Sequence, residues 1–168
     1  MNPKERERLF LELFLHNRER VMRLCHGYLN SAVDAEDLFQ EIMTRVWDSL
    51  PRFRGESLPA TWLYRIAVNS ALLYRRKNRA SAPLPELIDR ATLPHVELEK
   101  QERLTALRQA IAGLPEQDRL IAALLLEGLS YKEIADITGL TVNYVGVKIT
   151  RIRHALEKSM KESNYGNV

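Results

Sequence analysis

Apolar residues recur at helical spacing along nearly the whole chain, and this spacing is the strongest constraint on its fold. No segment alternates apolar and polar residues over the length of a strand between hairpin turns. Three prolines fall within twelve residues, at Pro83, Pro85 and Pro94. Proline removes a backbone donor and disfavours helix in the residue before it, so these prolines predict a break. We therefore expect an all-α protein with two small helical domains, at 1–80 and 95–168, joined by a flexible linker at 81–94.

Helix start and stop signals bracket five helices of ordinary length. Gly113-Leu114-Pro115 ends one of them and Gly128 ends the next, as glycine does at many helix C-termini. Two short helices and a tail are expected to follow, with the tail disordered after Met160. The five predicted helices span residues 3–28, 34–50, 58–78, 95–112 and 116–127.

The net charge of +3 is unevenly divided. Residues 1–80 carry a net charge of +4, residues 81–129 carry −3, and residues 130–168 carry +2. Two basic ends therefore flank an acidic middle. This distribution suggests two separate contacts with a polyanion.

Several protein classes are excluded. The longest apolar run, Leu120 to Leu126, is far shorter than the ~20 residues of a membrane-spanning helix, so no membrane insertion is expected. The mixed charges of the first eight residues, with no small-residue cleavage site after them, are unlike a secretory signal. Cys25 has no partner for an internal disulfide, and we expect it to be a buried apolar residue. These features favour the cytoplasm.

The segment from 130 to 145 has the pattern of a helix-turn-helix. Ser130 and Glu133 have the spacing of a capping box, and Ala135 is small where two helices approach. Gly139 suits the left-handed turn, and Thr141 can cap a second helix. The alternative interpretation is a plain helical hairpin whose polar face is only solvated.

The second helix of this motif separates into two faces at 100° per residue. The predicted core face holds Val142, Val145, Ile149, Ile152 and Leu156. The opposite face, which a DNA major groove would meet, holds Asn143, Tyr144, Val147, Thr150, Arg151 and His154. Phosphate contact is favoured by four basic residues, Lys148, Arg151, Arg153 and Lys158.

The predicted helix at 34–50 also has two faces. Its polar half contains Asp37, Gln40, Glu41, Thr44, Arg45 and Asp48. We name Asp37, Glu41 and Asp48 the acidic stripe. Because DNA is negatively charged, the stripe favours docking of a basic protein partner. A helix face that is merely solvated is the alternative.

The third predicted helix carries cations beside a loop with an aromatic residue. One stripe of this helix contains Arg65, Asn69, Leu72 and Arg76, with Arg75, Lys77 and Arg79 nearby. The loop at 53–59 contains Phe53 and Gly55. Cations, an amide and an aromatic ring together can hold an unpaired nucleotide base. Trp62 shares a face with apolar residues and is expected in the core.

Five sequence strings, in this order and spacing, resemble the extracytoplasmic-function (ECF) sigma factors of bacterial RNA polymerase. They cover nearly the whole chain and both predicted domains. The strings are Asp34-Ala-Glu-Asp-Leu-Phe-Gln-Glu-Ile-Met-Thr-Arg-Val-Trp, Phe53-Arg-Gly-Glu-Ser, Thr61-Trp-Leu-Tyr-Arg-Ile-Ala-Val-Asn, Leu114-Pro-Glu-Gln-Asp-Arg and Gly128-Leu-Ser-Tyr-Lys-Glu-Ile-Ala.

The resemblance implies a sigma factor that binds polymerase core and directs promoter recognition and melting. It assigns binding of the beta-prime clamp helices to Asp37, Gln40 and Glu41. In the minus-ten element, it assigns a flipped base to Phe53 and Asn69, and backbone contacts to Arg65, Arg75, Arg76 and Arg79. The helix-turn-helix would enter the minus-thirty-five element. From the outward face and the basic residues described above, the predicted contact residues are Asn143, Tyr144, Val147, Lys148, Thr150, Arg151 and His154. Further implied partners are the polymerase beta subunit and an anti-sigma factor, and the linker would thread the polymerase.

The recognition helix departs from the family pattern at one point. After the valine that stands here at Val145, family members commonly have Lys or Arg and then Ser. This chain has Gly146 and Val147 at those two positions. Base preference therefore does not transfer. Val147 can pack on a thymine methyl group, Asn143 can read an adenine and Arg151 a guanine. Gly146 costs roughly 1 kcal/mol against alanine in mid-helix, and close approach to DNA is one reason for it.

Two rival functions are weaker. An enzyme is not indicated because no phosphate-binding glycine motif is present, and the histidines at 16, 26, 95 and 154 lack metal-ligand spacing. We thus expect no catalytic residue, metal or cofactor. A stand-alone helix-turn-helix repressor of duplex DNA would explain residues 115–160. It would leave the acidic stripe and the segment from Phe53 to Arg79 without a purpose.

Overall fold

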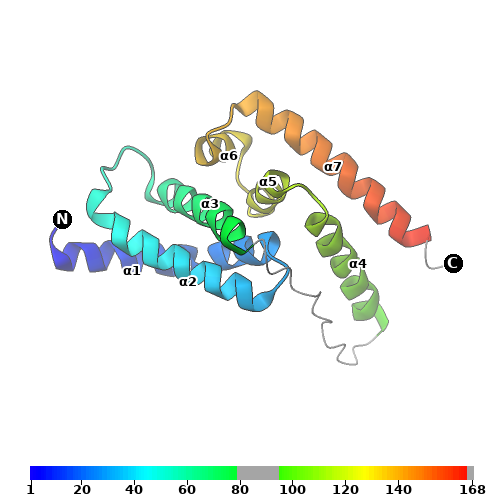
Figure 1. The fold of residues 1–168 in the computed structure, drawn as a ribbon, viewed down its shortest axis with the longest axis horizontal. Coiled ribbons are helices and arrows are strands. Elements are labelled where there is room, and N and C mark those ends of the chain that lie inside the picture. The colour runs from blue at the N-terminus through cyan, green and yellow to red at the C-terminus, as the bar shows by residue number, and fades with distance from the viewer. Residues whose placement is uncertain (79–94, 166–168) are drawn as a thin grey trace.

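The computed structural model describes residues 1–78 and 95–165, and over these residues the chain is helical with no strand (Figure 1). The all-α prediction is therefore confirmed. The predicted linker at 81–94 and Arg79 lie outside the described residues. The elements are α1 (Pro3–Tyr28), α2 (Ala32–Ser49), the short 3-10 turn η1 (Leu50–Arg52), α3 (Pro59–Asn78), α4 (His95–Ala112), α5 (Glu116–Leu126), α6 (Tyr131–Thr138) and α7 (Val142–Tyr165).

Side-chain caps set where several helices begin. The Asn2 side chain accepts a hydrogen bond from the Glu5 amide at 2.8 Å, one turn into α1. Helix α2 begins two residues before the predicted position because the Ser31 hydroxyl accepts from the Asp34 amide at 3.2 Å. The first five helix predictions are otherwise within one residue of the observed ends.

Helix α7 differs from the prediction. It is a single helix of 24 residues that continues to Tyr165, so a short final helix with disorder directly after Met160 was wrong. Residues 157–162 are rich in strong helix formers, with two glutamates, two lysines and a methionine. Helix α4 also packs along α7, which adds tertiary contacts to this propensity.

The helices form two halves that touch (Figure 1). We call α1–α3 the first half and α4–α7 the second half. Helix α1 contacts both α2 and α3, and α7 contacts α4, α5 and α6. The halves meet where α1 contacts α5 and where α3 contacts α6. Buried residues of both halves belong to one continuous apolar cluster, which includes Leu24, Ile42, Leu120 and Ile149.

Within residues 1–78 and 95–165, no helix combines the length and the apolar character needed to cross a membrane.

Cys25 lies fully buried on α1, as expected. Burial raises the pKa of its thiol to about 12. At pH 8 this shift lowers the thiolate share about a thousandfold relative to an ordinary cysteine.

We predict that a thiol reagent modifies the native protein at least about 100-fold more slowly than the urea-unfolded protein. Similar rates in the two states would show that Cys25 is accessible.

Candidate functional site

Helix α2 separates its faces as the sequence predicted. Leu38, Ile42 and Val46 are buried, whereas Asp37 and Gln40 are exposed. The apolar face therefore anchors α2 in the core, and the polar face points outward. This is a rigid platform for a partner.

The acidic stripe is not uniformly negative. The Glu41 carboxylate pairs with the Arg45 guanidinium one turn later on the same helix. The Asp48 carboxylate lies 3.9 Å from the Arg6 guanidinium of α1. Asp37 is exposed and has no ion pair among the described residues. The beginning of the stripe thus carries the least compensated charge.

The negative field of α2 reaches the neighbouring helix α3. The Tyr74 hydroxyl donates to the Asp34 carboxylate at 3.2 Å. Burial, the charge and hydrogen bond of Asp34, and the charges of Asp37 and Glu41 together raise the pKa of Tyr74 to about 12. The carboxylates on α2 therefore act together on a group one helix away.

The loop between η1 and α3 places Phe53 against Trp62. The Phe53 ring contacts the Trp62 ring with centroids 4.9 Å apart and planes tilted by 46°. Trp62 is itself half-buried and packs against the core, as the sequence indicated. Gly55 turns the loop with φ of +72°, a conformation that L side chains rarely adopt. Phe53 remains half-exposed near the N-terminal end of α3.

The predicted DNA-contacting residues of α3 divide into two groups. Asn69 and Arg76 are exposed. Arg65 instead donates from Nε to the backbone carbonyl of Asp136 in α6, at 2.9 Å. The Arg75 Nε lies 3.9 Å from the Glu116 carboxylate in α5. Two of the predicted DNA contacts thus face the second half of the molecule.

The helix-turn-helix has the local structure that its sequence indicated. Ser130 and Glu133 form the capping box, and hydrogen bonds from the backbone amide and hydroxyl of Ser130 lower the pKa of the Glu133 carboxyl. Gly139 has φ of +75° in the turn. The Thr141 hydroxyl accepts from the Tyr144 amide at 3.2 Å at the start of α7. Helices α6 and α7 are thereby fixed relative to each other.

The two faces of α7 are largely as predicted, with one correction. Val145, Ile149 and Ile152 are buried, but Val142 is 46% exposed. Val142 is the first residue of α7, and no neighbouring element covers it there. On the opposite face all six predicted groove-facing residues are exposed, namely Asn143, Tyr144, Val147, Thr150, Arg151 and His154.

Lys148 does not belong to that exposed face. Its side chain is 14% exposed, and its Nζ lies 2.6 Å from an Asp118 carboxylate oxygen in α5. The ammonium also lies 5.5 Å from the Tyr144 ring centroid. In this structure Lys148 therefore fastens α7 to α5. No sequence pattern signals this pair, whose members are thirty residues apart.

Gly146 has a neighbour within the chain. A Cβ atom added to it would lie 3.9 Å from the Tyr131 ring of α6, an ordinary van der Waals contact. Crowding inside the protein thus does not require glycine at this position.

Sequence reasoning missed a charged group between the two halves. Glu127 follows α5 and is paired with Arg20 and Arg23 of α1. The one available signal was a glutamate at a helix C-terminus, where negative charge is unfavourable unless a cation compensates it. Among the described residues, no cluster of three or more His, Cys, Asp or Glu side chains could hold a metal ion.

The Lys148–Asp118 pair generates a stability prediction. Replacing Lys148 with Met should lower the free energy of unfolding by about 2 kcal/mol, because the largely buried Asp118 carboxylate loses its partner. The matched change Arg151→Met, on the exposed face, should alter it by less than about 0.5 kcal/mol. Urea unfolding followed by circular dichroism measures both. Equal effects would show that the pair contributes nothing to stability.

Comparison with known proteins agrees with the geometry. Residues 13–81 match the Sigma-70 region 2 family, and residues 104–156 match Sigma-70 region 4. The chain is 29% identical to the RNA polymerase sigma-H factor of Pseudomonas aeruginosa, over 92% of this chain and 88% of the relative. It is 30% identical to the ECF RNA polymerase sigma-E factor of Escherichia coli, with the same two coverages.

The fold has a solved counterpart. The sigma factor RpoE of Bartonella quintana, crystallised with the anti-sigma factor NepR, superposes with a TM-score of 0.71 at 21% identity. The match covers 90% of this chain and 96% of that one. Family, relatives and fold lead to one assignment. The chain belongs to the ECF sigma factors, which bind RNA polymerase and direct it to promoters.

Proposed function

We propose that this sigma factor uses three separate surfaces: the start of the acidic stripe on α2 for polymerase core, the Phe53 loop with α3 for the minus-ten element, and the exposed face of α7 for the minus-thirty-five element. The observation that carries the assignment to promoter DNA is the outward face of α7. Six predicted groove-facing residues are exposed on this face, and the opposite face of the same helix is buried.

The core-binding surface centres on Asp37 and Gln40. Both are exposed on a helix that is anchored by its buried face. A basic partner such as the beta-prime clamp helices would meet the uncompensated Asp37 charge first. Glu41 would have to exchange its Arg45 partner for one on the polymerase.

For the minus-ten element, we propose that Phe53 stacks on an unpaired base and that Asn69 hydrogen-bonds to its edge. The Phe53 ring is supported by Trp62, so it needs little ordering before a base arrives. Arg76 is exposed on α3 and would contact the DNA backbone. Arg65, Arg75 and Arg79 are proposed for the same backbone, Arg79 from its sequence position alone.

For the minus-thirty-five element, the exposed face of α7 would lie in the major groove. Val147 would pack on a thymine methyl group, Asn143 would pair with an adenine and Arg151 with a guanine. Tyr144, Thr150 and His154 would complete the contact. Lys148 is also proposed to contact this DNA, but its ammonium group must first separate from Asp118.

The partners follow from these surfaces. The beta subunit of the polymerase is proposed as a further contact. An anti-sigma factor is proposed to cover the core-binding surface; the similar RpoE of Bartonella quintana forms a complex with the anti-sigma factor NepR. We place the protein in the cytoplasm, where the polymerase acts. No catalytic residue or cofactor is assigned, because RNA synthesis belongs to the polymerase. A stand-alone repressor would have no use for the exposed Asp37 surface.

Charge reversal tests the core-binding surface. Asp37→Lys should weaken binding to polymerase core at least tenfold, because it places like charge against a basic partner. Glu36→Lys is the matched control: it makes the same charge change at an exposed position on the same helix, about 100° away from Asp37. Its effect should stay below about threefold. Affinity is measured by fluorescence anisotropy of labelled sigma with purified core.

Equal losses in the two variants would indicate a general charge effect and contradict a local surface. If the folded wild type fails to bind core, the assignment of α2 as the core-binding helix is wrong.

Base readout is tested on a library of promoter variants with reconstituted polymerase. Val147→Ala and Asn143→Ala should each remove the preference at one base pair, worth about 1 to 3 kcal/mol, and leave the other positions unchanged. His26→Ala, at an exposed position on α1, should change none of them. A uniform loss of transcription across the library would show that neither residue reads a base.

A further inference from the structure

Three large apolar side chains are exposed on the helix-turn-helix. Tyr131 of α6 is 36% exposed, and Tyr144 and Val147 of α7 are 43% and 48% exposed. The core does not need them, because the opposite face of α7 is already buried. We call Tyr131, Tyr144 and Val147 the apolar patch. Neighbouring apolar groups that remain outside the core of a folded domain indicate a surface that another molecule covers.

Tyr144 and Val147 are neighbours on the surface of α7. They are three positions apart in the helix, which puts their Cβ atoms about 5–6 Å from each other on one face. Arg151 follows on the same face, seven positions after Tyr144, and is exposed. The face therefore begins with apolar groups and ends with a cation.

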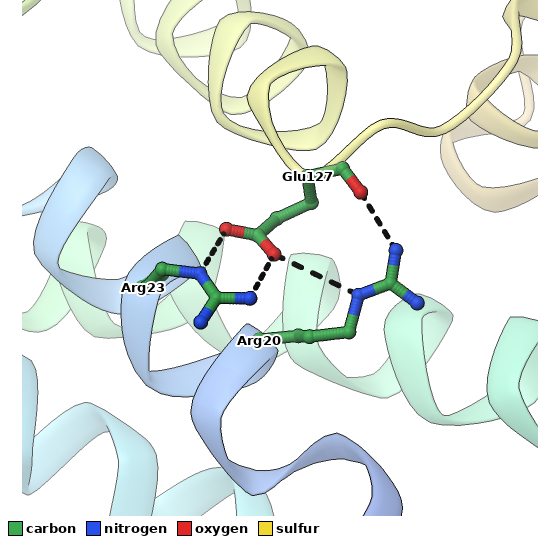
Figure 2. Close-up of polar contacts among 3 residues, drawn as sticks. All are labelled: Arg20, Arg23 and Glu127. Atoms are coloured by element: carbon green, nitrogen blue, oxygen red, sulfur yellow. Dashed lines mark hydrogen bonds and ion pairs between the residues drawn. The ribbon is translucent and has the colours of Figure 1, made fainter.

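The first two turns of α7 present no outward-pointing cation. Within residues 141–150, Lys148 is the one lysine or arginine. Its side chain is 14% exposed, and its Nζ lies 2.6 Å from an Asp118 oxygen. A protein carboxylate thus holds Lys148, as Glu127 holds the arginines drawn beside it in Figure 2. The Lys148 ammonium lies 5.5 Å from the centroid of the Tyr144 ring, so it supports this ring while the pair with Asp118 is formed.

Gly146 leaves the Tyr131 ring uncovered. A Cβ atom at position 146 would lie 3.9 Å from two carbons of this ring. A longer side chain there would begin in contact with the ring and cover part of it. Glycine therefore extends the apolar surface of α7 onto α6. Packing inside the protein does not explain the glycine, whereas an open Tyr131 ring does.

The major groove offers one apolar group to such a surface, the 5-methyl group of thymine. The other groups on the base edges are hydrogen-bond donors and acceptors, and Val147 can pair with none of them. Tyr144 and Val147 are about 4.5 Å apart along the helix axis, and successive base pairs are about 3.4 Å apart. The two side chains can therefore meet methyl groups of neighbouring base pairs.

The cations around the apolar patch make duplex DNA its occupant. Lys132 follows Tyr131 on α6, and Arg151 and Arg153 follow Val147 on α7. All three cations are exposed. Positive charges on both sides of an apolar surface complement the phosphates on both sides of a groove. An apolar peptide would have no use for them.

We propose that the first two turns of α7, with Tyr131 beside them, form a binding site for the 5-methyl group of a pyrimidine in the minus-thirty-five element. The inference rests on the groove contact proposed for α7. It goes further because Tyr144 and Val147 recognise the methyl group itself and not only the base that carries it. Thymine supplies this group in ordinary DNA. A promoter with cytosine at the same position would then be bound more tightly once that cytosine is methylated at carbon 5.

The methyl group can be removed alone by replacing each thymine of the element in turn with deoxyuridine. All hydrogen-bonding groups of the base remain. The probe is the labelled promoter duplex bound most tightly in the promoter library, and the protein is the full chain with polymerase core. The dissociation constant should rise about fourfold at one position or at two neighbouring positions, as expected for one buried methyl group. Elsewhere in the element it should change by less than about 1.5-fold.

Variants of α7 identify the protein side of the contact. Val147→Ala and Tyr144→Ala should each weaken binding of the thymine promoter, and deoxyuridine should then cost nothing more at the affected position. His154→Ala is the matched control, at an exposed position on the same helix two turns after Val147. It should keep the fourfold deoxyuridine effect. The substituted positions are all exposed, so circular dichroism should show native helix content.

Cytosine separates the methyl group from thymine. At the position where deoxyuridine weakens binding, 5-methylcytosine should be bound about fourfold more tightly than cytosine. Val147→Ala or Tyr144→Ala should remove this difference. At the other positions, methylation of cytosine should change the dissociation constant by less than about 1.5-fold.

The methyl site is wrong if deoxyuridine weakens binding nowhere in the element, or if 5-methylcytosine is bound no better than cytosine. It is also wrong if both alanine variants keep the full deoxyuridine effect. The groove contact is assayed separately by the base preferences of Asn143→Ala and Arg151→Gln. If these preferences shift while deoxyuridine has no effect, the methyl site fails alone. If neither preference shifts and no variant alters the deoxyuridine effect, α7 does not lie in the groove and both proposals fail.

Discussion

Helix α1 packs against both halves of the molecule, and much of the structure depends on it. Val21, Leu24 and Cys25 are fully buried in the apolar cluster, while Arg20 and Gly27 of the same segment meet α5. Because successive helical residues are 100° apart, one stretch of α1 can contact partners on several sides. The side chains of α1 that contact α5 are therefore carried by a helix that the core already holds in place. This lowers the conformational entropy lost when the contacts form.

The parts of the fold that could be predicted from sequence are those set by local chemistry. The capping box at Ser130 and Glu133, the left-handed turn at Gly139 and the cap at Thr141 involve groups within a few residues of each other. Helix ends were predicted well for the same reason. Prediction failed where propensity and packing had to be weighed together, as at the C-terminal end of α7.

Only those parts of the candidate site that follow helical periodicity could be predicted from the sequence. The exposed face of α7 follows from helical spacing, which also placed Val145, Ile149 and Ile152 in the core. Lys148 has the residue type of a phosphate contact, and only the fold reveals that it pairs with Asp118. The Arg65–Asp136 and Glu127–Arg23 contacts join residues 71 and 104 positions apart, so no local pattern contains them. Cations are versatile partners, and sequence cannot say which anion or carbonyl they meet.

Gly146 and Val147 stand where family members commonly have a basic residue and then a serine, and this difference alters the thermodynamics expected of promoter recognition. Val147 and Tyr144 present exposed apolar surface on the face proposed for the groove. Burying such surface gives a negative heat-capacity change, whereas each missing phosphate contact removes one counterion from those released on binding. Recognition by α7 would thus depend more on temperature and less on ionic strength than in a relative with a cation at this position. Promoter selection by this factor would then change less with intracellular salt than selection by such a relative.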